Sequence, residues 1–242
     1  MGKARPAIAS LVTAAALTLG ALGAAPAGAQ PKADPSPGTL PVATGKPTAP
    51  SVKGERSSST AFLRGRKVTR IPLVSASGYN RTKAVAYAVK YGKHRNTHYR
   101  AYSSNDCTNF ASQVMTAGGW KQAGRITYRR SDNRYWFYGP GAMWNTTSYS
   151  WTAAENWYWF AKKSHRTRLM SSVWDAAIGD VIQADWNHDG QIDHTMIVTK
   201  DTGRDLLVTY HTRNQVNTSL KKIIDRYRSH GAKYYAHRVG SD

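Results

Sequence analysis

The stretch Asp106-Cys107-Thr108-Asn109-Phe110-Ala111-Ser112-Gln113 contains the only cysteine of the 242-residue chain. Phe110, Ala111 and Val114 follow Cys107 at the spacing of one helical face, and all three are apolar. The stretch therefore predicts a helix that opens at Cys107 and packs this face against the rest of the domain.

The two ends of this predicted helix carry their own signals. Gly118-Gly119 ends it, as a glycine C-cap would, and a side-chain oxygen of Asn105 or Asp106 can cap its start. Cys107 then lies over the positive end of the helix dipole, which favours the thiolate. A thiolate is a strong nucleophile towards amide and ester carbonyls.

A lone buried cysteine that behaves as a small apolar residue is the alternative interpretation of Cys107. Three features favour the nucleophile: the helix-opening position, the polar neighbours, and a histidine-bearing strand further along the chain. A secreted chain also rarely keeps one cysteine without a use.

The N-terminus has the pattern of a secretory signal peptide over residues 1–29. Lys3 and Arg5 form the positive region, residues 7–24 are apolar, and 27–29 is a small-residue cleavage site. An uncleaved anchor is the alternative, but the apolar run is rich in alanine and ends in a processing site. We expect a secreted protein, associated with the cell wall, without stable membrane insertion after cleavage.

Residues 30–77 differ in composition from the remainder. Six of the ten prolines lie between Pro31 and Pro50, among Ser, Thr, Gly and Ala. Such a segment buries too little apolar surface to offset its chain entropy, so we expect a disordered linker or pro-segment. Residues 78–242 have the length of one domain.

The net charge of the chain is +20, from 34 basic and 14 acidic residues. Loss of Lys3 and Arg5 with the signal peptide leaves 32 basic residues against 14, or +18. This charge predicts an anionic partner, and peptidoglycan or another anionic cell-wall polymer suits a secreted protein. No nucleic-acid-binding motif is visible, so we expect no nucleic-acid partner. Plain solubility is the alternative role of the charge.

The domain changes from helical to extended patterns along its length. Asn80 can cap a helix at 83–91, and Thr152-x-x-Glu155 is a capping box before a helix at 153–162. A short helix is expected at 220–227. Strands are predicted at 179–185, 195–199, 206–210 and 232–239, with turn signals at Asp189-Gly190 and Thr202-Gly203. Helices followed by an antiparallel meander predict an α+β fold.

Residues 120–159 hold six of the eight tryptophans, with several tyrosines among them. Rings at this density either fill a core or line a groove for sugars and peptides.

Two histidines accompany the predicted strands. His194 opens the second strand and His211 follows the third, so the two can be neighbours at one end of the sheet. If the Cys107 helix crosses that sheet, His194 can take the thiol proton as general base, and His211 can fix its tautomer. The backbone N–H of Cys107 is a natural oxyanion donor, with Gln113 and Asn109 as weaker candidates.

The stretches 106–113, 179–182 and 193–198 together resemble the amidase domain of bacterial secreted proteins. That family belongs to the papain-like cysteine peptidase superfamily, beside the NlpC-type and CHAP cell-wall hydrolases. The NlpC-type enzymes carry a similar Asp-Cys-Ser-Gly stretch, a Gly-Asp before a strand, and a His that opens the next strand. The resemblance covers the chain from about Tyr79 to its end and implies a papain-like fold, with N-terminal helices packed on an antiparallel sheet.

The same resemblance implies roles for individual residues. Cys107 would be the nucleophile, His194 the base, and His211 the third polar residue. Asp106 would orient the nucleophile loop, and Tyr102 would face the site. Thr108-Asn109 replaces the small Ser-Gly pair of the NlpC-type enzymes, and the papain-type motif around the cysteine is absent.

Residues 185–193 follow the first nine positions of an EF-hand loop, D-x-N-x-D-G-x-I-D. A structural Ca²⁺ would take Asp185, Asn187, Asp189 and Asp193 as ligands. The twelfth position is Met196, which lacks the bidentate carboxylate, and the flanks are strands. The alternative is an Asp-Gly hairpin with polar residues at its tip. No cofactor is required, and no zinc-ligand pair such as His-Glu-x-x-His occurs.

These observations predict a secreted, cysteine-dependent amidase or peptidase that acts on amide bonds of bacterial peptidoglycan. The alternative is a non-catalytic, basic cell-wall-binding module that keeps the fold.

Overall fold

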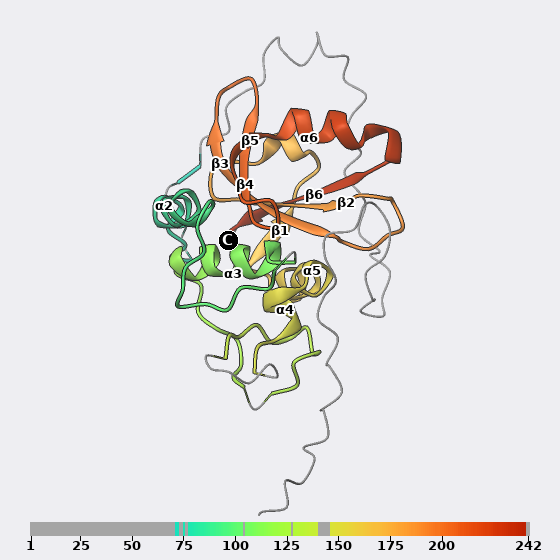
Figure 1. The fold of residues 1–242 in the computed structure, drawn as a ribbon. Helices are drawn as coiled ribbons and strands as arrows, with labels where there is room; N and C mark the ends of the chain where they lie inside the picture. The colour runs from blue at the N-terminus through green and yellow to red at the C-terminus, as the bar shows by residue number, and fades with distance from the viewer. Residues whose placement is uncertain are drawn as a thin grey trace, which may run out of the picture. The chain divides into compact units, whose positions relative to one another are not determined.

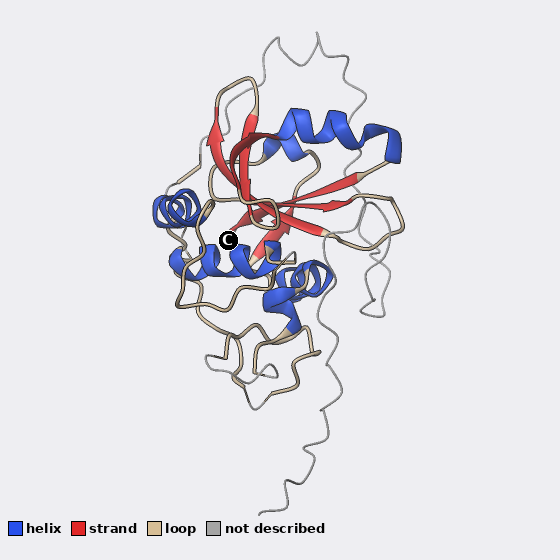
Figure 2. Cartoon of the chain, viewed as in Figure 1, coloured by secondary structure: helices blue, strands red, loops and turns tan. Residues whose placement is uncertain are grey.

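The computed structural model describes residues 71–72, 75, 77–103, 105–126, 128–139 and 146–240. These residues form an α+β domain in which helices precede a six-stranded antiparallel sheet (Figures 1 and 2). The predicted α+β class is therefore confirmed. The predicted signal peptide and most of the predicted linker lie outside the described residues. Within the described part, no helix has the length and apolar character needed to cross a membrane.

The helices begin close to where the sequence predicts them. Asn80 caps the first one, because its side chain accepts a hydrogen bond from the backbone N–H of Lys83 at 2.9 Å. The helices are α2 (Arg81–Tyr91), α3 (Cys107–Ala117), α4 (Tyr149–Thr152), α5 (Ala154–Lys163) and α6 (Leu220–Tyr227), with 3-10 turns η1 (Val173–Asp175) and η2 (Arg228–His230).

The capping box predicted before α5 is not formed. Thr152 ends the short helix α4, and Ala153 is the N-cap of α5 without a side-chain cap. Glu155 instead accepts hydrogen bonds from the indole of Trp159 and from the backbone N–H of Ile192. The side chain that would close a capping box is therefore used to tie α5 to the loop before β3.

The sheet has the order β1-β6-β2-β3-β4-β5, and its paired strands are antiparallel. Its strands are β1 (Thr167–Leu169), β2 (Val181–Asp185), β3 (His194–Asp201), β4 (Leu206–Tyr210), β5 (Gln215–Ser219) and β6 (Lys233–Val239). The four predicted strands correspond to β2, β3, β4 and β6. The edge strand β1 has only three residues, and the sequences of both edge strands, β1 and β5, lack the apolar alternation that marks a buried strand.

The two faces of the sheet bury different sets of side chains, because successive residues of a strand point to opposite faces. Ile182, Met196 and Val198 belong to a core cluster with residues of α6. Val181 and Ile197 belong to a second cluster with residues of α2 and α3. Figure 1 shows the result, with α6 above the sheet and α2 and α3 on its other side.

The tryptophan-rich region supplies core packing to the second cluster. Trp136, Trp151, Trp157 and Phe160 are completely buried, and Trp120 is nearly so. Trp136 stacks on Trp151 with ring centroids 4.5 Å apart, and Trp120 stacks on Trp157 at 6.1 Å. These buried rings therefore fill the core, and they do not line a substrate groove.

Candidate functional site

Helix α3 begins at Cys107, as predicted, and its first turn packs on strand β3. The Cys107 side chain is 6% exposed and is not in a disulfide. Its Sγ lies 3.7 Å from Oγ1 of Thr108, which in turn lies 3.0 Å from Oγ1 of Thr195. Cys107 therefore lies beside Thr108, which contacts Thr195 of β3. Thr195 is the residue that follows His194.

Asp106, just before the cysteine, is the most heavily hydrogen-bonded carboxylate of the site. Its Oδ1 accepts from the backbone N–H of Tyr102 at 3.0 Å and from Asn109 Nδ2 at 2.8 Å. Its Oδ2 accepts from His211 Nδ1 at 2.7 Å and from Arg95 Nε at 3.0 Å. Four donors occupy both oxygens, as an ionised carboxylate allows. The carboxylate makes no capping bond to α3, so that expectation is wrong for Asp106.

His211 is buried beside Asp106 and does not contact His194 through its ring nitrogens. Its Nδ1 lies 2.7 Å from Oδ2 of Asp106, and its Nε2 lies 2.8 Å from the backbone carbonyl oxygen of Tyr91. The ring also stacks on Phe110 of α3, with centroids 4.0 Å apart. Both ring nitrogens therefore have partners other than His194. The expected hydrogen bond from His211 to His194 is therefore wrong in this structure.

His194 is the first residue of β3, and its ring is almost completely buried. The ring meets Tyr210 edge-on at 4.9 Å between centroids and lies 5.5 Å from the ring of Trp186. Burial lowers the pKa of His194 to about 3, with a smaller contribution from the positive charge of Arg213. Nδ1 has no hydrogen-bond partner among the described residues. The ring is thus neutral at ordinary pH.

The two histidines lie on opposite faces of the sheet. Thr195 points to α3, so the preceding residue His194 points to the α6 face, where its contacts Trp186 and Tyr210 belong to the α6 cluster. His211 lies on the α3 face, as its contacts with Phe110 and Asp106 show. The structure thus joins His211 to Asp106, the residue before Cys107, on the α3 face, whereas the ring of His194 lies on the α6 face. The role of His194 as general base stays a prediction.

The weaker oxyanion candidates are occupied by packing contacts. Gln113 Oε1 accepts from the hydroxyl of Tyr87 at 2.7 Å. Asn109 Oδ1 accepts from the indole of Trp151 at 2.9 Å, and its Nδ2 donates to Asp106. Backbone N–H groups of the first turn of a helix lack partners within the helix, so the start of α3 keeps the better donor set.

The predicted calcium loop is held by its own hydrogen bonds. Asp185 and Asp193 accept backbone N–H groups within the loop at 3.0 and 2.7 Å. The side chains of Asn187 and Asp189 bond each other at 3.1 Å. Across the part of the chain that the structure describes, no group of three or more His, Cys, Asp or Glu side chains could hold a metal ion. The loop joins the antiparallel strands β2 and β3, and Ca²⁺ binding stays an untested prediction.

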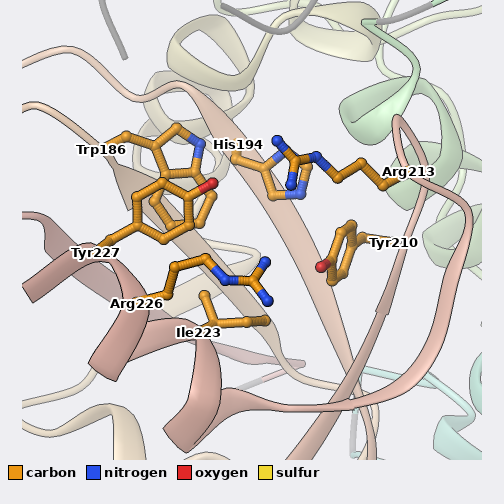
Figure 3. Close-up of a pocket in the computed structure, with 7 residues that line it drawn as sticks. All are labelled: Trp186, His194, Tyr210, Arg213, Ile223, Arg226 and Tyr227. Atoms are coloured by element: carbon orange, nitrogen blue, oxygen red, sulfur yellow. The ribbon is translucent and has the colours of Figure 1, made fainter. Parts of the chain in front are cut away.

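A small pocket opens on the α6 face, against the ring of His194 (Figure 3). Its volume is about 20 Å³, which is room for about one water molecule. The sequence did not indicate it, because its walls come from four separate segments. Besides His194, the walls include Trp186, Tyr210, Arg213, Arg226 and Tyr227.

Comparison with known proteins gives a family but no characterised relative. The chain is 28% identical over 179 residues to the uncharacterized protein YjcM of Bacillus subtilis, a match that covers 70% of this chain and 39% of that protein. It is 36% identical over 138 residues to the uncharacterized protein YhbB of the same organism, covering 55% of this chain and 42% of that protein. The chain thus spans about two fifths of the length of these relatives. No solved structure matches it.

The family comparison covers most of the folded part of the chain. A model described as "Putative amidase domain" matches residues 78–235, which include α2, the Cys107 helix, both histidines and nearly all of the sheet. The chain therefore belongs to the putative amidase domain family.

Proposed function

We propose that this chain is an exported, cysteine-dependent hydrolase that cleaves amide bonds in bacterial peptidoglycan. The family supplies the general chemistry of amide hydrolysis. One observation carries the choice of nucleophile: the only cysteine is the first residue of α3, beside the buried pair of Asp106 and His211. A papain-like arrangement of helix and sheet is part of this proposal.

The charges around Cys107 favour its thiolate form. The N-terminus of α3 contributes the positive end of the helix dipole. Arg95 adds a positive charge, which Asp106 offsets in an ion pair. The end of the helix dipole therefore supplies the positive environment that stabilises a thiolate.

In the proposed reaction the thiolate attacks the amide carbonyl carbon, and a C–S bond forms as the carbonyl oxygen becomes an oxyanion. Backbone N–H groups at the start of α3 stabilise that charge. The C–N bond then breaks, the amine leaves with a proton from the general acid, and a thioester remains on Cys107. Water hydrolyses the thioester, which releases the carboxylic acid and restores the cysteine.

His194 is the proposed general base, because a base needs a nitrogen lone pair. The His194 ring is neutral and has an Nδ1 without a partner among the described residues, whereas both nitrogens of His211 have hydrogen-bond partners. Because successive strand residues project from opposite faces, proton transfer requires the backbone at the start of β3 to rearrange so that the His194 ring reaches the start of α3. In this scheme His211 positions the loop before Cys107 and stabilises the charge of Asp106. It does not fix the tautomer of His194.

The cell wall is the proposed place of action. The signal-peptide pattern at residues 1–29 supports export, and the charge of +18 after cleavage supports retention on anionic wall polymer. The proline-rich segment would act as a tether.

A second candidate function follows from the burial of Cys107, which is 6% exposed. A thiol enclosed to this degree fits a basic wall-binding module that has kept the fold without turnover. This candidate shares the predicted partner and differs only in chemistry.

Hydrolysis of purified peptidoglycan by the parent and by Cys107→Ala separates the two candidates. We expect the variant to release no new amino groups while it still binds the wall, and iodoacetamide to label Cys107 of the parent quickly at neutral pH. His194→Ala should lose turnover with folding intact. Equal turnover by the parent and Cys107→Ala would refute the proposal of a cysteine-dependent enzyme. If His211→Ala lost turnover while His194→Ala kept it, His194 would be refuted as the base.

A further inference from the structure

The α6-face pocket collects two guanidinium groups beside a buried neutral imidazole. Figure 3 shows the Arg213 side chain reaching over the ring of His194, and the guanidinium of Arg226 extending towards Tyr210. The positive charge of Arg213 also contributes to the lowered pKa of His194. Positive charge is therefore concentrated at one small opening.

Neither arginine has a carboxylate partner among the described residues. The nearby acidic residue of α6, Asp225, pairs instead with Lys221 at 2.8 Å and with Arg228 at 2.5 Å. His194 Nδ1 is buried, and it too has no partner in the described part of the chain. The two guanidinium groups therefore offer donors suited to an oxyanion.

The remaining walls are aromatic and aliphatic. Trp186 and Tyr227 stack with ring centroids 4.2 Å apart, and Ile223 closes the pocket from α6. A phosphate group, which is strongly hydrated on all sides, gains little from such walls. A carboxylate attached to a small alkyl group uses both parts of the pocket, because its charge meets the arginines and its carbon atoms meet the rings.

We propose that this pocket binds the terminal carboxylate of a short peptide, with Arg213 and Arg226 pairing with its two oxygens. The pocket has room for about one water molecule, so a single carboxylate oxygen enters it and the rest of the group stays at its mouth. The identity of the peptide rests on the proposed function, since the peptide stems of peptidoglycan end in such groups. The existence of the site does not depend on turnover.

The test is a calorimetric titration of the full chain, carrying Cys107→Ala to prevent turnover, with N-acetyl-alanine. N-acetyl-alanine amide lacks the charge, and inorganic phosphate supplies the other oxyanion. We expect binding of the carboxylate alone, weakened roughly tenfold by Arg213→Gln or Arg226→Gln, which is the loss expected for one charge-assisted pair. Lys222→Gln removes an exposed charge from the same helix and should leave the affinity unchanged.

Several outcomes would overturn the proposal. The first is equal binding of the amide, and the second is equal weakening by Lys222→Gln and Arg226→Gln. Tighter binding of phosphate than of the carboxylate would replace it with a phosphate site. Thermal unfolding of each variant confirms that these exposed substitutions leave the fold intact. Absence of binding together with active hydrolysis by the parent would remove the pocket and leave the proposed enzyme standing.

Discussion

Asp106 connects the helix that carries Cys107 to the strand that ends before His211. Because Asp106 directly precedes Cys107, the sequence predicts that it lies near the proposed nucleophile. The resemblance to cysteine hydrolases implied an orienting role for it. Its partners were not predictable, since Arg95 and His211 come from segments 11 and 105 residues away. Likewise, alternation along a strand places the side chains of His194 and Thr195 on opposite faces of the sheet. Only the fold shows which of these two faces packs on α3.

Asp106→Asn should destabilise the domain strongly. The amide removes the negative charge and leaves His211 and Arg95 without compensation in a buried setting. The expected loss is about 3 kcal/mol in the free energy of unfolding, measured by urea denaturation. Asp132→Asn, which breaks the exposed pair with Arg134, is the matched control and should have little effect. Similar losses in the two variants would contradict the role of the buried network.

The two buried neutral histidines should make the domain less stable in acid. Burial lowers the pKa of His194 and of His237 to about 3, from an ordinary value of 6.5. Between these values the unfolded chain binds a proton at each site and the folded chain does not, so stability falls as the pH drops from about 6.5 towards 3. Each site contributes a slope on the order of 1 kcal/mol per pH unit.

Urea denaturation from pH 7 to pH 4 measures this slope. His194→Gln and His237→Gln should each flatten the fall in stability by about one proton, and the double variant by about two. A parent curve with the same steepness as that of the double variant would show that these rings are protonated in the folded domain.

At the scale of elements, local signals predicted where helices begin more reliably than how they are capped. Asn80 caps α2 and Cys107 opens α3, as the sequence indicates. The capping box at Thr152 fails because Glu155 reaches the loop before β3, a contact across 37 residues. The strands β1 and β5 escaped prediction because edge strands need little apolar alternation.

Arg81 ties α2 to the sheet, and its removal should destabilise the domain. Its guanidinium donates to Asp180 Oδ1 at 2.7 Å and to backbone carbonyls of Ile178 at 2.8 Å and Val239 at 2.5 Å. Arg81→Met leaves Asp180 buried with less compensation, so we expect a loss of about 3 kcal/mol in a thermal or urea unfolding experiment. Lys83→Met, an exposed change on the same helix, is the control. A loss no greater than that of the control would contradict this account.

At the scale of the whole molecule, the pattern of helices and strands predicted the α+β class, which the structure confirms. The anionic partner inferred from composition stays a prediction. The pocket on the α6 face could not be foreseen, because it depends on Arg213 and Arg226 meeting across the end of the sheet. The sequence allowed the aromatic residues of 120–159 either to fill a core or to line a groove. The burial of Trp136, Trp151 and Trp157 shows that these rings belong to the core.

The positive charge should make wall binding depend on salt. The chain should remain on purified cell walls at low ionic strength and elute as sodium chloride rises towards 1 M, where the screening length falls to about 3 Å. Walls stripped of their anionic polymers are the control and should retain less protein. Retention that is unaffected by both salt and stripping would argue against an electrostatic partner.

The central claim is that Cys107 forms a covalent bond with the substrate during amide hydrolysis. Intact-protein mass spectrometry after acid quenching of the enzyme with soluble peptidoglycan fragments tests it most directly. We predict an added acyl mass that maps to the peptide containing Cys107, is absent from Cys107→Ala, and is removed by hydroxylamine. Hydrolysis that proceeds with no adduct on the parent, and equally in Cys107→Ala, would contradict the claim.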